Sequence, residues 1–78
     1  MLTRYLDAAL RRARYEILKE DGSYYGEIPD CRGVYANAAS LEDCRAALAA
    51  TLEDWILLRI HQHLPLPRID GMTLTVKK

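Results

Sequence analysis

The sequence has no long hydrophobic run, and this absence excludes one large class of proteins. A membrane-spanning helix needs about 18 to 20 consecutive apolar residues, and no segment of the 78-residue chain approaches that length. Residues 1–13 carry arginines inside their apolar pattern rather than before it, which is not the arrangement of a signal peptide. We therefore expect a cytoplasmic protein that does not bind a membrane.

An excess of charge of either sign is also missing. Eleven basic residues balance eleven acidic ones, so the chain has no overall field that would attract nucleic acid or an anionic membrane. Direct DNA binding is therefore not expected, and RNA binding would require a local basic patch.

Residues suited to catalysis or metal binding are few and scattered. Cys31 and Cys44 are not at a metal-ligand spacing, so we expect two reduced thiols, with a disulfide between them as the alternative. His61 and His63 are two positions apart, and that step on a helix points them in different directions. No nucleophile with a neighbouring base and no phosphate-binding glycine loop is present. Five acids near the predicted turns are the remaining metal candidates: Asp21, Glu27, Asp30, Glu42 and Asp43.

An amphipathic helix is predicted over residues 2–13. Its apolar residues recur at three- and four-residue steps, and Thr3 is a candidate cap. Its other side carries Arg4, Arg11 and Arg12, which suits either a solvated helix face or a basic binding surface.

Three short antiparallel strands are predicted over residues 14–38. Asp21-Gly22 is a strong tight-turn signal between two tyrosine-containing runs, 14–20 and 23–28. Pro29 cannot donate to a strand ladder and Gly33 permits unusual backbone angles, so the second strand ends there. Alternation over residues 34–38 predicts the third strand.

A long helix is predicted over residues 40–63, opened by a Ser40 cap with acids in the first turn. From Trp55 onward its apolar residues surround the helix, which one small sheet cannot cover. A second subunit or the N-terminal helix must therefore pack on the far side, and we expect a homodimer or homotetramer. The residues predicted in the core or the oligomer interface are Trp55, Ile56, Leu58 and Ile60. Alternation over residues 72–77 predicts a final strand.

Several short motifs follow one another in an order typical of one family. They are Tyr15-Glu16-Ile17-Leu18, the turn Glu20-Asp21-Gly22, the run Tyr24-Tyr25-Gly26-Glu27-Ile28-Pro29-Asp30, then Gly33, Ala36 and the helix opening Ser40-Leu41-Glu42-Asp43. In this order they resemble the HicB-like family of bacterial antitoxins, whose domain is partial ribonuclease-H-like. Three departures accompany the resemblance: Cys31-Arg32 replaces a common Leu-Pro, residues 1–13 add a helix, and we expect no DNA-binding module after the domain.

The resemblance implies a single α+β domain over residues 1–78, in the order helix, three-stranded antiparallel sheet (14–38), long helix and final strand. It also implies a non-enzymatic antitoxin or orphan relative without a cofactor, which binds and neutralises a small RNA-cleaving, HicA-like toxin through protein contact. Asp30, Arg32 and Tyr35 are the expected contact residues, because they lie in or beside the family's loop. The alternatives are a stand-alone oligomeric RNA- or protein-binding module with no toxin partner, and a vestigial metal-dependent nuclease.

Overall fold

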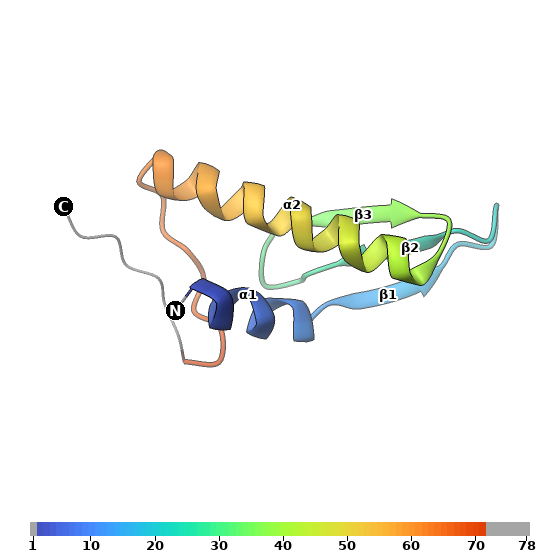
Figure 1. Ribbon diagram of the computed structural model, residues 1–78, viewed down its shortest axis with the longest axis horizontal. Helices are drawn as coiled ribbons and strands as arrows, with labels where there is room; N and C mark the ends of the chain where they lie inside the picture. Colours follow the sequence, from blue (N-terminus) through green and yellow to red (C-terminus); the bar gives the residue numbers. More distant parts are fainter. Residues whose placement is uncertain (1, 72–78) are drawn as a thin grey trace.

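The computed structural model describes residues 2–71 and has two helices and one three-stranded sheet in these residues (Figure 1). In chain order the elements are α1 (Leu2–Arg11), β1 (Arg14–Ile17), β2 (Tyr24–Glu27), β3 (Tyr35–Ala38) and α2 (Leu41–His61). The α+β class and the predicted order of these five elements are confirmed. The final strand predicted over residues 72–77 lies outside the described residues.

The three strands form an antiparallel meander in the order β1-β2-β3. The predicted turn between β1 and β2 is confirmed at Asp21, whose carboxylate accepts hydrogen bonds from the Ser23 amide (3.0 Å) and hydroxyl (2.7 Å). These bonds lower the pKa of Asp21, the hydroxyl of Ser23 contributing most. Gly22 has a φ of +71°, which glycine adopts without the steric cost that a side chain would add.

Gly26 allows an aromatic ring to lie directly across β2. Its partner on β1 is Tyr15, and a Cβ on Gly26 would lie 2.7 Å from Tyr15 Cε1 and 3.2 Å from the Sγ of Cys44 on α2. A larger residue at this position would therefore collide with both layers. The absence of a side chain on Gly26 sets how closely the sheet and α2 approach.

α2 begins as predicted and buries one stripe. The Ser40 Oγ accepts a hydrogen bond from the Asp43 amide at 3.1 Å, which satisfies a free N–H at the helix start. The buried residues of the stripe are Cys44, Leu48, Leu52 and Ile56. The helix ends at His61, two residues earlier than predicted, and His63 follows with a φ of 58°.

α1 lies beside the half of α2 that extends beyond the sheet (Figure 1). It buries Tyr5, Ala8 and Ala9 against the core, so the predicted role of the N-terminal helix as a cover for α2 is confirmed. Two details were wrong. The helix ends at Arg11 rather than at residue 13, and Thr3 lies within it and is not its cap.

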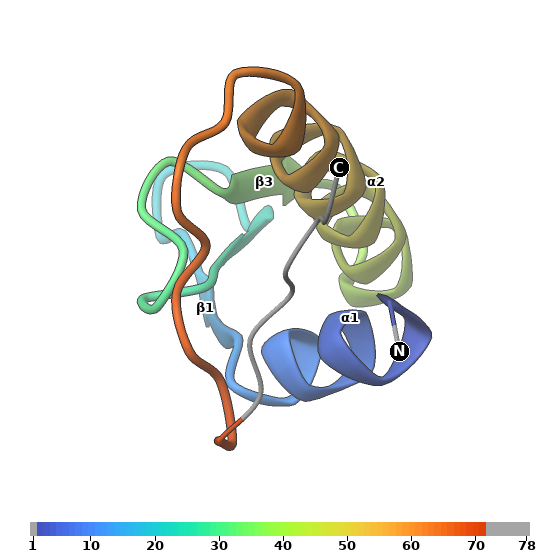
Figure 2. The ribbon, with the colours of Figure 1, turned by 90° about the vertical axis from the view of Figure 1, so that its left-hand side faces the viewer.

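Residues 64–70, which we call the return segment, run from the end of α2 back across the end of the molecule toward α1 (Figure 2). Two of its backbone carbonyls are held by side chains of the helices. Arg59 Nε donates to the Pro65 carbonyl at 2.9 Å, and the Tyr5 hydroxyl donates to the Pro67 carbonyl at 2.5 Å. Ile69 is fully buried. The return segment therefore closes the core where the sheet does not reach.

The Tyr5 hydroxyl gives stability a specific pH dependence. Burial is the main cause that raises its pKa to about 12, above the value of about 10 in an unfolded chain. The contribution of the protonated Tyr5 hydroxyl to the free energy of unfolding is complete below about pH 10, and it is lost as the pH rises through about 12. We expect Tyr5→Phe to lower the free energy of unfolding by about 1 kcal/mol at neutral pH, because the Pro67 bond is lost.

The difference between wild type and Tyr5→Phe should shrink above about pH 10, where only the wild type loses the Tyr5 contribution. Urea denaturation at neutral and alkaline pH measures it. Tyr35→Phe, at an exposed position, is the control for removal of a hydroxyl. A gap that stays constant across this pH range would contradict the assigned role of Tyr5.

Candidate interaction surfaces

The loop between β2 and β3 is anchored by buried residues and hydrogen bonds of its own. Ile28, Cys31 and Val34 are buried, and the amides of Cys31 and Val34 donate to the carbonyls of Ile28 (2.9 Å) and Cys31 (3.1 Å). Gly33 has a φ of +96°, so the backbone reversal depends on it. Arg32 is left exposed at the tip.

Arg12 joins this loop to the return segment. Its Nε donates to Asp30 Oδ2, and its Nη1 donates to Asp70 Oδ1 at 2.8 Å. The hydrogen bond to Asp30 is the main reason that the pKa of Arg12 is raised. We call these three residues the Arg12 clasp. We expected Asp30 to contact a second protein, but its carboxylate is paired with Arg12 of the same chain.

A hollow of about 320 Å³ lies between the loop and the end of α2. We call it the loop hollow; its lining residues are Asp30, Arg32, Trp55, Arg59, Pro65, Leu66 and Pro67. The Arg59 guanidinium lies 4.9 Å from the centre of the Trp55 ring, a cation–π distance. Trp55 is only half-buried, so it packs on the core with part of its surface and borders this hollow with another part.

Tyr35 lies away from the loop hollow, on the sheet face opposite α2. This outer face carries the alternate strand residues Arg14, Glu16, Tyr25, Glu27, Tyr35 and Asn37. The Tyr25 and Tyr35 rings are stacked with centroids 6.3 Å apart, and the Tyr25 hydroxyl donates to Glu27 Oε1 at 3.1 Å. Tyr35 is 60% exposed. The three residues predicted to contact a toxin are thus divided between two surfaces.

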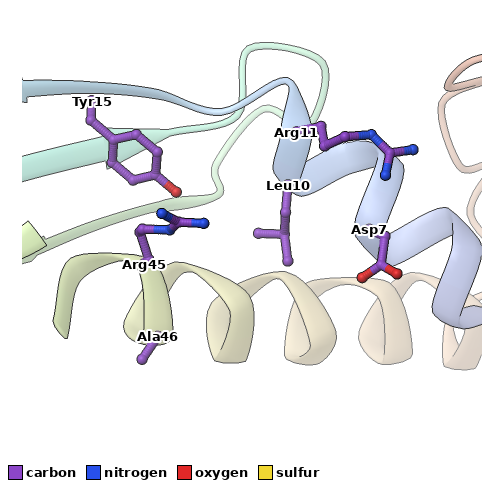
Figure 3. Close-up of a pocket in the computed structure, with 6 residues that line it drawn as sticks. All are labelled: Asp7, Leu10, Arg11, Tyr15, Arg45 and Ala46. Atoms are coloured by element: carbon purple, nitrogen blue, oxygen red, sulfur yellow. The ribbon is translucent and has the colours of Figure 1, made fainter. Parts of the chain in front are cut away.

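A groove of about 430 Å³ runs between α1, the start of β1 and α2 (Figure 3). Its lining residues are Asp7, Leu10, Arg11, Tyr15, Arg45 and Ala46. The Tyr15 hydroxyl points toward the Arg45 guanidinium. Burial raises the pKa of Tyr15, while the nearby charge of Arg45 acts in the opposite direction. Sequence reasoning missed Arg45, because an arginine on a helix is usually only a solvated residue.

The residues predicted in the core or an oligomer interface have different positions. Ile56 is fully buried, Trp55 and Ile60 are half-buried against the core, and Leu58 is 53% exposed. Leu57, next to it, is 59% exposed. The N-terminal helix therefore covers only part of the apolar surface at this end of α2.

The candidate metal-binding residues do not come together. Asp21 lies at the hairpin turn, Glu27 at the far end of β2 and Asp30 in the clasp. Within residues 2–71 no three histidine, cysteine or acidic side chains are grouped closely enough to hold a metal ion. Cys31 and Cys44 are free and buried. Burial raises the pKa of the Cys31 thiol to about 11, which keeps it protonated and unreactive.

Neither described helix has the length and hydrophobicity that crossing a membrane would require.

Comparisons with known proteins identify a matching family and a similar crystal structure. A family model described as UPF0150-like matches residues 4–67. The crystal structure of TTHA0281 from Thermus thermophilus superposes with a TM-score of 0.90 at 44% sequence identity, over 99% of this chain and 95% of that one. No curated protein matches the chain.

The Arg12 clasp generates a prediction about local stability. Arg12→Ala removes both ion pairs, so amide hydrogen exchange in residues 28–34 and 64–70 should become several-fold faster, while the strand amides change little. Arg12→Lys should be intermediate, because it keeps the positive charge but lacks the planar guanidinium whose Nε and Nη1 each hold one carboxylate. Arg11→Ala, the adjacent arginine, is the control. Equal exchange in Arg12→Ala and Arg11→Ala would show that the clasp does not hold these segments.

Proposed function

The chain belongs to the UPF0150-like family, the family of HicB-like antitoxin domains, and on that premise we propose that it binds and neutralises a small RNA-cleaving toxin. The family match over residues 4–67, which includes the loop from Ile28 to Val34, is the observation that carries the proposal. The protein acts by covering the toxin and performs no catalysis itself.

The outer face of the sheet supports contact with such a partner. A toxin that cleaves RNA needs a basic surface to hold its substrate. Glu16 and Glu27 flank a stacked tyrosine pair on the outer face, against the single basic residue Arg14. Tyr35 is exposed and Tyr25 is half-buried beside it. Accessible tyrosines serve well as interface anchors, since each offers a large apolar ring and a hydroxyl. Tyr25 and Tyr35 therefore form the centre of the proposed contact, with carboxylates around them.

The loop residues divide into two roles. Arg32 is exposed beside the loop hollow and reaches a partner directly. Asp30 contributes through the Arg12 clasp, since its carboxylate holds the loop in place. Substitution of Asp30 should therefore weaken partner binding through the loop conformation, as substitution of Arg12 would.

The first test uses the toxin-like protein encoded nearest to this chain's gene. Mixing the two should give a defined heteromeric mass by light scattering. Arg32→Ala/Tyr35→Ala should weaken the complex at least about tenfold, as expected when an exposed aromatic anchor is removed. Lys19→Ala/Arg68→Ala, at two other exposed positions, should retain wild-type affinity.

Two outcomes count against this proposal. If the chain does not bind the toxin-like protein, it would instead be a stand-alone binding module. A complex that forms but is equally tight in both double variants would place the contact on another surface.

We also propose that the chain forms a homodimer or homotetramer through the exposed end of α2. Leu2, Leu6, Ile56 and Leu57 border an apolar hollow of about 230 Å³, with Glu53 at its side. Leu58 follows on the same helix and is exposed as well. A chain this small gains proportionally more from covering such a patch than a larger protein does.

Leu57→Glu/Leu58→Glu places two charges in the proposed interface, so the mass of the oligomer should fall to that of one chain. Sedimentation or light scattering measures this at several protein concentrations. Leu41→Glu, an exposed leucine at the other end of α2, should leave the oligomer intact. A wild type that is monomeric at all concentrations would refute self-association.

A further inference from the structure

The groove in Figure 3 is lined by polar groups from three elements that are separate in the sequence. Arg11 comes from α1, the Tyr15 hydroxyl from β1 and Arg45 from α2. The groove exists only because α1 packs beside α2 at the end of β1. Two guanidinium groups and a phenol along one groove offer several hydrogen-bond donors to an anion.

A second hollow continues this basic surface along α1. It has a volume of about 400 Å³, and its lining residues are Arg4, Asp7, Arg11 and Asp70. The two hollows share Asp7 and Arg11, so Arg4, Arg11 and Arg45 border two neighbouring hollows that meet at these side chains. Arg4 and Arg11 are seven residues apart on α1, about 10 Å along the helix axis. We call these three arginines the arginine track.

The side chains of the arginine track are not committed to ion pairs within the described chain. The salt bridges found in residues 2–71 are the two made by Arg12. The sequence assigned Arg12 to the same basic surface as Arg4 and Arg11, but Asp30 and Asp70 hold it in the clasp. Arg45 from the other helix takes its place. The acids that line the two hollows are Asp7 and Asp70. Asp70 is already paired with Arg12, so Asp7 remains as the negative charge beside the three arginines of the track.

We infer that the arginine track binds the phosphate backbone of single-stranded RNA. A row of separated cations suits a polymer with regularly repeated charges. An acidic protein partner is less well matched, because the apolar part of the groove consists of Leu10, Ala46 and the half-buried ring of Tyr15, without the exposed aromatic anchors of a protein interface. One edge of the Tyr15 ring, Cδ1–Cε1, lies against Gly26. The contacts of the track are with phosphates, which every nucleotide carries, so recognition is independent of base sequence. This surface is distinct from the outer face and the loop hollow.

Fluorescence anisotropy with a labelled 12-nucleotide oligouridine, without any toxin, tests the inference. Three phosphate contacts should give a plot of log affinity against log salt with a slope of about −2, at about −0.7 per contact in single strands. Arg11→Ala/Arg45→Ala should make that slope shallower by about 1.4 and weaken binding at least about fivefold at low salt. Arg11→Lys/Arg45→Lys, which keeps both charges, should retain most of the affinity.

The matched control is Lys19→Ala/Arg68→Ala, which removes the same net charge elsewhere and should bind like the wild type. Circular dichroism and thermal melting establish that every variant is folded. Equal weakening in the control and in Arg11→Ala/Arg45→Ala would overturn the inference, because binding would then follow net charge alone. No detectable binding by the wild type at low salt would also overturn it. Displacement of the oligouridine by polyglutamate at matched charge would assign the track to an acidic protein.

Discussion

The difference in length between α2 and the sheet governs the rest of this structure. A four-residue strand spans about 13 Å, whereas the 21 residues of α2 span about 31 Å. The sheet can therefore cover only one half of the helix. The other half carries Leu52 and Ile56, which are fully buried, so other segments must complete the core. α1, the β2–β3 loop and the return segment all gather at that end.

The surfaces available to partners follow from this arrangement. The groove between α1 and α2 is bordered by arginines from both helices. The loop hollow, where the return segment lies beside the β2–β3 loop, contains Trp55 and Arg59. The outer face of the sheet differs from both, because the three paired strands form it by themselves. It does not depend on which segments cover the half of α2 that extends beyond the sheet.

Local features of the fold were predictable from the sequence, and pairings between distant residues were not. The Asp21-Gly22 turn and the Ser40 cap depend on residues within a few positions of one another, so their patterns are visible in the chain. The family was recognised for the same reason, since its motifs are short and ordered. Arg12 and Asp30 are 18 positions apart, and no periodicity connects them. The position of Arg45 beside Tyr15 likewise depends on how α1 and α2 pack, which composition does not specify.

Contacts between residues far apart in the chain affect the order in which the elements can fold during translation. The bond from Tyr5 to Pro67 joins residues 62 positions apart, and that from Arg12 to Asp70 joins residues 58 apart. The β1–β2 hairpin needs only neighbouring residues and can form while translation continues. α1 has no complete docking site until the return segment has left the ribosomal tunnel, so this helix, though synthesised before the sheet and α2, is secured among the last elements.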